Sequence, residues 1–551
     1  MLGALAIAAF PASAAKLEKA SPNPDFVSYL KQLEIGTAGL GLETEGRSHG
    51  HIPGPVDLSH TVGKQVIDQR RLTALPSSYD LRDQGRLTPV KDQGDCGACW
   101  SFATYGSLES WLLTNDEGDW DFSEKNLIEC HGFDWNPCYG GNMFMSTSYL
   151  ARRSGPVSEA DDPYVDYESG CTSGLPVRKY VEDVYMPPSV GGPEDNSALK
   201  QAVMDFGAVS TSMYSHESYY NSSDYTYYYS GTNAINHAVA IIGWDDGKSV
   251  PGAPGDGAWI VRNSWGTSFG EDGYFYISYY DSKVGLYNAA FIHAEEPDDT
   301  KLYEYDPLGW VTDLGFESTT AWGANVFTAN STGQLTAVST YATDVNTSYD
   351  IYVSDEDSGS LVRKKSGTFN YPGYHTVDLS SPTSLEPGET FTVAIRYQTS
   401  GYTHPLPAEC RVSDYSSAAT ASSGQSYVSP DGSSWSDLTT LEGGSTCNIN
   451  IKATVTTGGP NPPSNLTATS VSSSQIDLSW QDNSSDETGF KVYRDGTQID
   501  TVGSDVTSYQ DDGLSEDTEY CYSVSAYNGD GESGQSNQAC ATTSGEASLT
   551  K

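Results

Sequence analysis

The 551-residue chain contains few basic residues. Lys and Arg together number 29, against 73 Asp and Glu, so the formal net charge is −44. Nucleic-acid binding depends on cationic side chains that neutralise phosphates, and we therefore expect no nucleic-acid partner. Long apolar runs are also missing. The apolar stretch at residues 1–15 is shorter than the roughly 18 residues of a transmembrane helix, and no later run approaches that length, so we expect no membrane span.

Cysteine is scarce as well, with nine residues in the chain. An odd number leaves one thiol over when eight residues form four disulfides. Disulfides persist in oxidising compartments, which indicates a secreted or cell-surface protein. Residues 1–15 (MLGALAIAAFPASAA) agree, because they end in an A-x-A cleavage pattern, although the usual positively charged front is missing. We predict a signal peptide at residues 1–14.

Three short motifs stand out in the sequence. Residues 96–100 (CGACW) match the nucleophile signature C-G-[SA]-C-[WY]. His237 lies in an apolar stretch, and Asn263 lies in the run NSWG. Cys99 and His237 are 138 residues apart (237 minus 99), within the roughly 130–150 residues typical of that signature.

The chemistry of a thiol nucleophile explains each of these residues. A free thiol is mostly protonated at neutral pH, so Cys99 needs a lower pKa. Residues 98–113 have helical apolar spacing, which puts Cys99 at the positive end of a helix dipole. His237 would pair with the thiolate and later protonate the leaving amine, while Asn263 would orient the imidazole. The side chain of Gln93 and the backbone N–H of Cys99 would form the oxyanion hole.

With these residues in place, the chain resembles papain and the cathepsins over about residues 75–294. The resemblance is carried by residues 75–82 (LPSSYDLR), 87–94 (LTPVKDQG), 138–141 (CYGG), 263–266 (NSWG) and 270–274 (GEDGY). Two departures are mild: Arg262 stands where Lys is more usual, and the loop 246–257 is longer than in papain.

This resemblance implies an α+β cysteine endopeptidase with a helical left half and a β-barrel right half. It acts on proteins or peptides through a Cys99 acyl-enzyme and needs no metal or organic cofactor. Gly140 and Gly141 would pair with substrate backbone, Met213 and Ala238 would line a substrate subsite, and Trp265 would cover the His237–Asn263 bond beside the substrate. The resemblance also suggests the disulfides Cys96–Cys138 and Cys130–Cys171, and Cys410–Cys447 and Cys521–Cys540 would then pair in the later domains.

Other segments flank the protease region. Residues 15–74 hold the position of an inhibitory pro-segment, although they show no strong periodicity and none of the longer helical motifs of cathepsin pro-segments. A surface extension that stays attached is the alternative.

The two segments that follow residue 294 alternate at period two and are predicted to be β-sandwiches. With the runs 324–327 (ANVF), 373–377 (GYHTV) and 429–435 (SPDGSSW), residues 295–457 resemble a lectin-like domain. The resemblance suggests a carbohydrate or cell-surface ligand, although a spacer domain is equally compatible with the residues. After a linker at 458–463, residues 464–543 resemble a fibronectin type III domain with Trp480 in its core, and 544–551 form a tail.

Three alternatives remain open from the sequence. The chain could be a surface adhesin with a catalytically silent protease scaffold. It could be an exopeptidase, for which the loop 246–257 is the candidate that blocks one end of the cleft. His216 is a rival to His237, but it lacks the flanking apolar strand.

Overall fold

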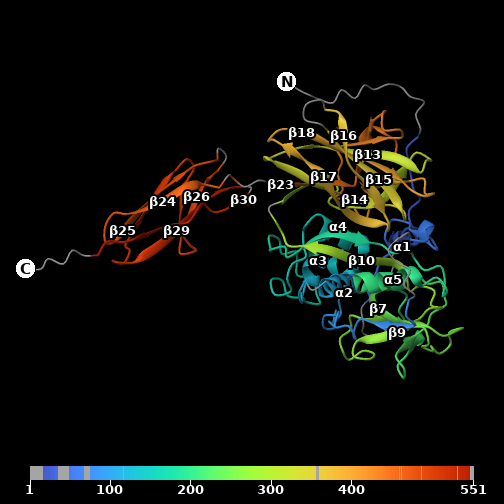
Figure 1. Ribbon diagram of the computed structural model, residues 1–551. Helices are drawn as coiled ribbons and strands as arrows, with labels where there is room; N and C mark the ends of the chain where they lie inside the picture. Colours follow the sequence, from blue (N-terminus) through green and yellow to red (C-terminus); the bar gives the residue numbers. More distant parts are fainter. Residues whose placement is uncertain are drawn as a thin grey trace, which may run out of the picture.

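The computed structural model describes residues 16–34, 49–66, 75–115, 117–298, 300–354, 359–457, 460, 462–484, 487–529 and 531–545. The predicted signal peptide lies outside these ranges, as do half of the linker 458–463 and most of the tail 544–551. Figure 1 shows the helices gathered in one part of the molecule and two β-rich parts beyond it. Among the described residues, no helix is both long and apolar enough to cross a membrane.

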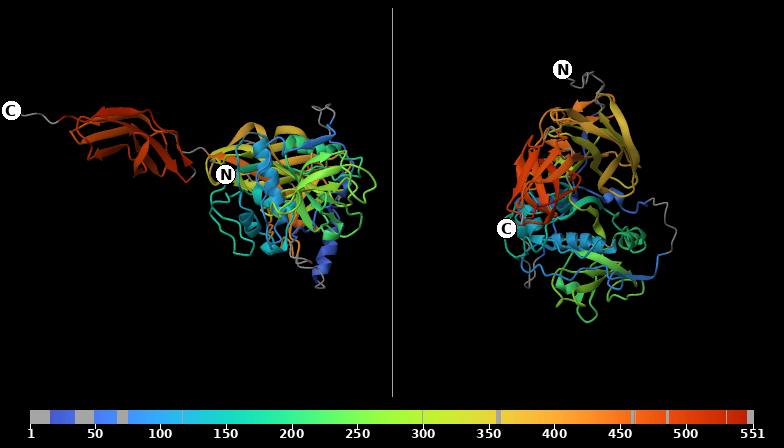
Figure 2. Two further views of the ribbon diagram at one scale, coloured as in Figure 1. Left: turned by 90° about the horizontal axis from the view of Figure 1, so that it is seen from below. Right: turned by 60° about the vertical axis from the view of Figure 1, so that its left-hand side comes forward.

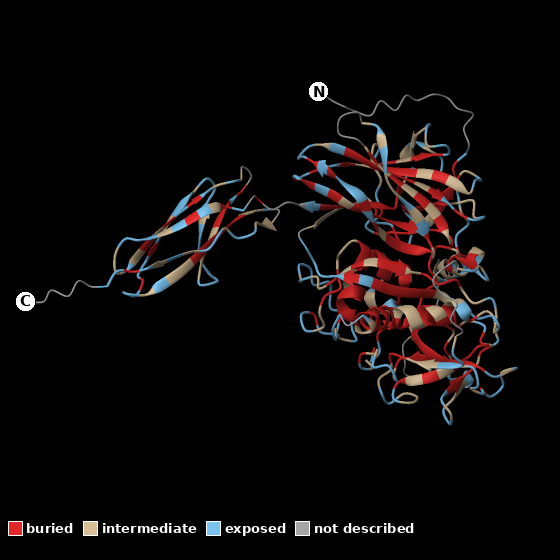
Figure 3. Cartoon of the chain, in the orientation of Figure 1, coloured by how far each residue is buried: buried red, intermediate tan, exposed pale blue. Residues whose placement is uncertain are grey.

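The protease part is built around helix α2 (Cys99–Thr114). Residues 99–112 of this helix are all buried, including polar side chains such as Glu109, which accepts the hydroxyl of Thr88. Figure 3 shows that α2 and the strands against it form the most buried region of the molecule. The other helices here are α3 (Glu124–Cys130), α4 (Met143–Ala151) and α5 (Ser197–Phe206), with the short helical turns η2 (Pro137–Tyr139) and η3 (Glu217–Tyr219).

The strands of this part belong to a sheet that continues into the next domain. They are β2 (Ser78–Asp80), β3 (Tyr180–Tyr185), β4 (Val209–Met213), β5 (Tyr220–Asn221), β6 (Thr226–Tyr227), β7 (His237–Asp245), β8 (Ala258–Arg262), β9 (Tyr274–Ser278) and β10 (Leu286–Glu295). The strand order is β11-β23-β14-β17-β3-β10-β4-β7-β8-β9-β6-β5, and β2 also pairs with β7.

The junction in this sheet differs from the separate units that the sequence suggested. Strand β3 pairs with β10 of the protease on one side and with β17 of the lectin-like domain on the other, in the register His375↔Asp183. Asp183 also bridges the two parts, because its carboxylate lies 2.6 Å from His293 Nδ1 and 3.4 Å from His375 Nδ1. Shared backbone pairing makes these two domains one continuous structure.

The lectin-like domain packs its sheets face to face. The strands of this domain are β11 (Thr300–Tyr303), β12 (Thr312–Gly315), β13 (Thr320–Thr328), β14 (Gly333–Ala342), β15 (Thr347–Ser354), β16 (Leu361–Phe369), β17 (Gly373–Leu385), β18 (Thr390–Gln398), β19 (Leu406–Cys410), β20 (Ser426–Ser429), β21 (Ser436–Asp437), β22 (Cys447–Ile449) and β23 (Ile451–Thr457), with the turn η4 (Leu438–Thr440). One further sheet has the order β16-β15-β18-β13-β20-β21. Its inner side chains meet those of β14, β17 and β23 in a separate apolar core.

The last domain has its own core around Trp480, which is 6% exposed, as the sequence predicted. The hydroxyl of Tyr520 accepts the backbone N–H of Ser515, 3.1 Å away, which is the tyrosine corner expected of this fold. Its strands are β24 (Ser464–Ser470), β25 (Gln475–Gln481), β26 (Gly489–Arg494), β27 (Thr497–Gly503), β28 (Ser508–Asp512), β29 (Glu519–Asn528), β30 (Gly531–Glu532) and β31 (Ala539–Thr542). The left view of Figure 2 shows this domain to one side of the other two.

The segment before residue 75 lies against both of the first two domains. Strand β1 (Glu18–Lys19) pairs with β12, and helix α1 (Pro24–Glu34) places Phe26 against Tyr415, with ring centroids 5.1 Å apart. This helix was not expected, because an isolated 11-residue helix gives a weak periodic signal and depends on the tertiary packing of its apolar face.

Beyond α1 the same segment contacts the lectin-like domain again. After the turn η1 (Ser59–Thr61), Lys64 Nζ donates to the buried carboxylate of Asp344 at 2.7 Å. The ring of His60 stacks on Tyr402 with a centroid distance of 3.7 Å. The segment is therefore attached to the lectin-like domain at both of its ends.

Candidate functional site

Cys99 is the first residue of helix α2, the position that the sequence predicted. It is the free cysteine and is fully buried. Its Sγ accepts the backbone N–H of Ala238 at 3.3 Å, which places the thiol beside the start of strand β7. Cys96–Cys138 ties the loop just before the helix to the segment that carries Gly140.

His237 and Asn263 come from neighbouring strands. His237 begins β7, and Asn263 directly follows β8, which is paired with β7. The Nε2 of His237 lies 2.8 Å from the Oδ1 of Asn263. In the described part of the chain His237 Nδ1 has no hydrogen-bond partner, so it is the ring nitrogen left for proton exchange with the thiol. Trp265 stacks on the imidazole at 4.6 Å between centroids and covers it.

Gln93 lies in the same site and is fully buried. Its Oε1 accepts the hydroxyl of Ser264 at 2.6 Å, and its Nε2 donates to the carbonyl of Cys96 at 2.8 Å. An amide nitrogen has two hydrogens, so Nε2 can donate to Cys96 and to a substrate oxygen at the same time. Tyr164 OH donates to the Gln93 carbonyl at 2.8 Å. The contacts of Ser264 and Tyr164 with Gln93 were not predicted, because neither residue type has a distinctive spacing.

The other predicted cysteine pairs are also present, namely Cys130–Cys171, Cys410–Cys447 and Cys521–Cys540. Gly141 packs directly on Trp100, since a Cβ there would lie 2.4 Å from the indole. Gly140 has φ +120° and would bring a Cβ within 2.6 Å of the Gly50 carbonyl oxygen. These two contacts explain why both positions are glycine.

The cleft between the two halves is crossed by residues 49–52 of the chain's own N-terminal segment. The N–H of Gly141 donates to the Gly50 carbonyl, and the N–H of Ile52 donates to the Gly141 carbonyl, both at 2.9 Å. On the opposite wall, the N–H groups of Gly50 and His51 donate to the Asn236 carbonyl at 3.2 and 3.0 Å. The backbone pairing that we predicted between Gly141 and a substrate is thus made here by Gly50 and Ile52.

The fit around Gly50 leaves no room for a side chain. A Cβ on Gly50 would lie 2.0 Å from the carbonyl oxygen of Gly97, next to the nucleophile. On one side of it, the ring of His49 meets the His237 ring edge to face at 5.5 Å. On the other side, His51 is buried. No local sequence pattern marks this contact, and the sequence analysis did not predict it.

Burial under this segment changes the pKa of both predicted catalytic groups. It raises the pKa of the Cys99 thiol to about 12 and lowers the pKa of His237 to about 3, because a buried site disfavours each charged form. The pKa of His51 is lowered to about 3 for the same reason. The covered site therefore holds a neutral thiol and a neutral imidazole instead of an ion pair.

Met213 and Ala238 lie near the site but on opposite faces of the sheet. Met213 is the cross-strand partner of His237, whereas Ala238 is paired with Ser212. Met213 lines a cavity of about 330 Å³ beside Trp265, together with the aromatic side chains of Tyr220 and Tyr227. Ala238 lines a much smaller cavity with Phe102 and Ala103 of α2. His216, the alternative to His237 in the sequence, borders the larger cavity as the N-cap of η3. The hydrogen bond to Asn263 is made by His237.

Comparison with known proteins places matches along most of the chain. The profile described as "Papain family cysteine protease" matches residues 75–294, "Lectin like domain" matches 302–455, and "Fibronectin type III domain" matches 461–542. Procathepsin L of Mus musculus is 32% identical over 239 residues, covering 42% of this chain and 69% of the relative. Cathepsin K of Gallus gallus is 36% identical over 212 residues, covering 37% of this chain and 59% of the relative.

The Cathepsin L-like peptidase of Aedes aegypti is 34% identical over 204 residues, covering 36% of this chain and 58% of the relative. The chain thus spans little more than half the length of some of these relatives. Among solved structures, the cysteine protease and lectin-like domains of Cwp84, a surface layer associated protein of Clostridium difficile, align with a TM-score of 0.67 and 26% identity. That alignment covers 81% of this chain and all of the other.

The pKa shifts predict how Cys99 responds to pH. In the full chain we expect almost no alkylation of Cys99 by iodoacetamide between pH 6 and 9, because the raised pKa keeps the thiol protonated. Once residues 1–74 are removed, water and a charged His237 favour the thiolate, and alkylation at pH 6 should be at least ~100-fold faster. Mass spectrometry locates the adduct, and Cys99→Ser is the control. Equal rates in the two forms would contradict this electrostatic account.

Proposed function

Because this chain belongs to the papain family of cysteine proteases, we propose that it is a secreted or cell-surface cysteine endopeptidase that cleaves peptide bonds in proteins or peptides. The observation that carries the proposal is the arrangement of Cys99, the His237–Asn263 pair and Gln93 around one cleft. Four disulfides favour an oxidising compartment outside the cytoplasm.

The proposed reaction uses each of these residues in turn. The Cys99 thiolate attacks the substrate carbonyl carbon, and the resulting oxyanion is stabilised by the Nε2 hydrogen of Gln93 and the backbone N–H of Cys99. The imidazolium of His237 gives its proton to the leaving amine as the C–N bond breaks, which leaves a thioester on Cys99. Neutral His237 then takes a proton from water, whose oxygen attacks the thioester and releases the acid.

Endopeptidase action is favoured over exopeptidase action by the position of the loop 246–257. This loop follows the last residue of β7, whereas His237 is the first residue of that nine-residue strand. At about 3.3 Å per residue, the loop begins roughly 26 Å from His237. Asp246 is also held by Lys200 and by the hydroxyl of Tyr279, away from the cleft. The residues that flank the loop, Asp245 and Ala258, are paired with each other, so the loop closes a hairpin at the end of β7 opposite His237.

We also propose that residues 15–74 are an inhibitory pro-segment. The support is the occupied cleft, where residues 50–52 take the hydrogen bonds of Gly141 and bury Cys99. The contacts of His60 and Lys64 with the lectin-like domain extend the attachment beyond the cleft. The alternative of an adhesin with a silent protease gains no support from the site, because every residue of the catalytic set is present and hydrogen-bonded.

For the lectin-like domain we propose carbohydrate binding at the outer face of the sheet that contains β13, β15 and β18. Trp322 lies 5.0 Å from Tyr352 and 6.4 Å from Trp435 between ring centroids, and none of the three is fully buried. Trp322 is also the cross-strand partner of Arg396, which donates to Asp350 at 3.1 Å. Aromatic rings beside a few fixed polar groups are typical of small-molecule and sugar sites.

Active-site titration tests the protease proposal. After removal of residues 1–74, an epoxysuccinyl inhibitor should label Cys99 stoichiometrically, and the protein should hydrolyse an internal peptide bond. Cys99→Ala should abolish both effects. Gln93→Ala should lower kcat by about 10²–10³, the cost of one oxyanion donor, while the exposed Gln84→Ala leaves it unchanged. Absence of labelling in every processed form would favour the adhesin.

Substitution of Gly50 tests the pro-segment. In the unprocessed chain, Gly50→Ala forces a Cβ against the Gly97 carbonyl, so the segment should leave the cleft more easily and peptide hydrolysis should rise about tenfold or more. Val62→Ala, at a side chain 43% exposed in the same segment, is the matched control and should have no effect. The processed forms lack both positions and should be equally active. An unprocessed Gly50→Ala chain as inactive as the parent would contradict the proposal.

Binding to insoluble polysaccharides tests the sheet face. We expect the Cys99→Ala chain to be retained on at least one of chitin, cellulose and xylan, and Trp322→Ala to lower retention about tenfold, because stacking contact is lost. Tyr167→Ala removes a 62% exposed aromatic residue from the protease domain and should leave retention unchanged. Equal retention of the two variants would place the binding elsewhere.

A further inference from the structure

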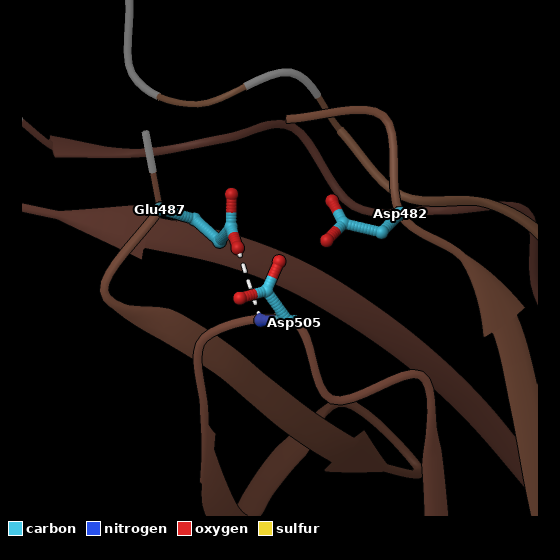
Figure 4. Close-up of side chains that lie close together, drawn as sticks. All are labelled: Asp482, Glu487 and Asp505. Carbon is cyan, nitrogen blue, oxygen red and sulfur yellow. Dashed lines mark hydrogen bonds between the residues drawn. The ribbon is translucent and has the colours of Figure 1, made fainter. Parts of the chain in front are cut away.

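Three carboxylates meet at one end of the fibronectin type III domain. Asp482 directly follows β25, Glu487 lies two residues before β26, and Asp505 lies between β27 and β28. One oxygen from each lies within 4.8 Å of the oxygens of the other two. Figure 4 shows the three side chains pointing toward one another across a common space.

The charges of this group are not balanced by the protein. Within the described residues, no Lys, Arg or His forms a salt bridge with any of the three carboxylates. The Lys and Arg side chains of this domain pair elsewhere, Lys491 with Glu532 and Arg494 with Asp511. Carboxylates that share a site without a cation repel one another.

Glu487 adds an independent observation. Its side chain is 8% exposed, and Oε1 accepts the backbone N–H of Asp505 at 3.1 Å. The second oxygen, Oε2, is buried and has no hydrogen-bond partner. A buried carboxylate oxygen normally has a partner, because its hydration is lost on folding. Figure 4 shows the Glu487 carboxylate facing the space that it shares with Asp482 and Asp505.

We propose that this group binds a divalent cation, with Ca²⁺ as the ion that fits it best. The donors are all carboxylate oxygens, which hard cations prefer. Ca²⁺ bonds to oxygen at 2.3–2.6 Å, so two ligands on opposite sides of one ion are about 4.8 Å apart. The observed separations let a single ion contact all three residues. Ca²⁺ also accepts irregular ligand geometry, whereas Mg²⁺ requires a near-ideal octahedron.

The position of the group indicates what the ion does. The side chain of Asn483 donates to the carbonyl of Pro462 at 2.8 Å, and Pro462 belongs to the linker from the lectin-like domain. Asp482 accepts the backbone N–H of Ser484 at 2.9 Å within the same loop. An ion that fixes Asp482 to Glu487 and Asp505 therefore also fixes the loop that holds the linker. Bound Ca²⁺ thereby fixes Pro462, two residues before β24, to the end of the domain that holds the ion.

Calorimetric titration of the full-length Cys99→Ala chain with CaCl₂ tests this proposal. We expect one Ca²⁺ per chain at this site with a Kd of roughly 10⁻⁴–10⁻³ M, the range of extracellular modules. Saturating Ca²⁺ should raise the unfolding temperature of the last domain, and MgCl₂ at the same concentration should give a smaller rise. Glu487→Gln keeps the shape of the side chain and should weaken binding tenfold or more.

Two further variants keep the result interpretable. Asp482→Asn changes a partly exposed residue of the same group and should weaken binding even if Glu487→Gln unfolds the domain. Asp512→Asn is the matched control, because Asp512 is exposed and pairs with Gln475 at the opposite end of β25. It should bind as the parent does. The proposal would be overturned if the parent bound no Ca²⁺ up to about 10 mM, or if Asp482→Asn bound Ca²⁺ as tightly as the parent. It would also be overturned if acid without Ca²⁺ stabilised the last domain, because the three carboxylates would then share a proton.

Discussion

The backbone pairing of residues 50–52 with Gly141 and Asn236 is the interaction on which the described state of this protein depends. Water and the opposite charge stabilise a thiolate and an imidazolium, and an extended segment that fills the cleft removes the water. The same hydrogen bonds that would position a substrate thus keep Cys99 and His237 neutral. Because they involve backbone atoms, they make no demand on side chains, except that Gly50 must have none.

The lectin-like domain takes part in this arrangement. It is joined to the protease by the pairing of β17 with β3, and the two parts share Asp183 as the partner of His293 and His375. The N-terminal segment pairs with β12 before it enters the cleft and stacks on Tyr402 after it leaves. The segment is thus held in the cleft and, on both sides of it, by contacts with the lectin-like domain. Release of the segment from the cleft is therefore linked to its contacts with the lectin-like domain.

The strongly acidic composition has different consequences in different parts of the molecule. Most carboxylates contribute to a solvated surface. A few are buried with partners, such as Asp344 with Lys64 and Asp306 with Lys452. The group around Glu487 differs from these because its charges face one another without a basic side chain. With 73 acidic and 29 basic residues, basic partners cannot be present everywhere, and cations from the solvent are the remaining means of balance.

The sequence by itself determined the succession of three domains, and through its resemblance to a known family it predicted the candidate catalytic set and the cysteine pairs. Cys99, His237, Asn263 and Gln93 could be found because the reaction demands particular residue types, and the fold demands their order and approximate spacing. Trp480 could be found because a core Trp recurs at a fixed place in such a sandwich. Only the tertiary structure decided which strand occupies the cleft, that β3 joins two domains, and that Asp482, Glu487 and Asp505 converge. Each of these depends on segments far apart in the chain, and backbone pairing or electrostatic proximity leaves no local pattern by which such partners could be recognised.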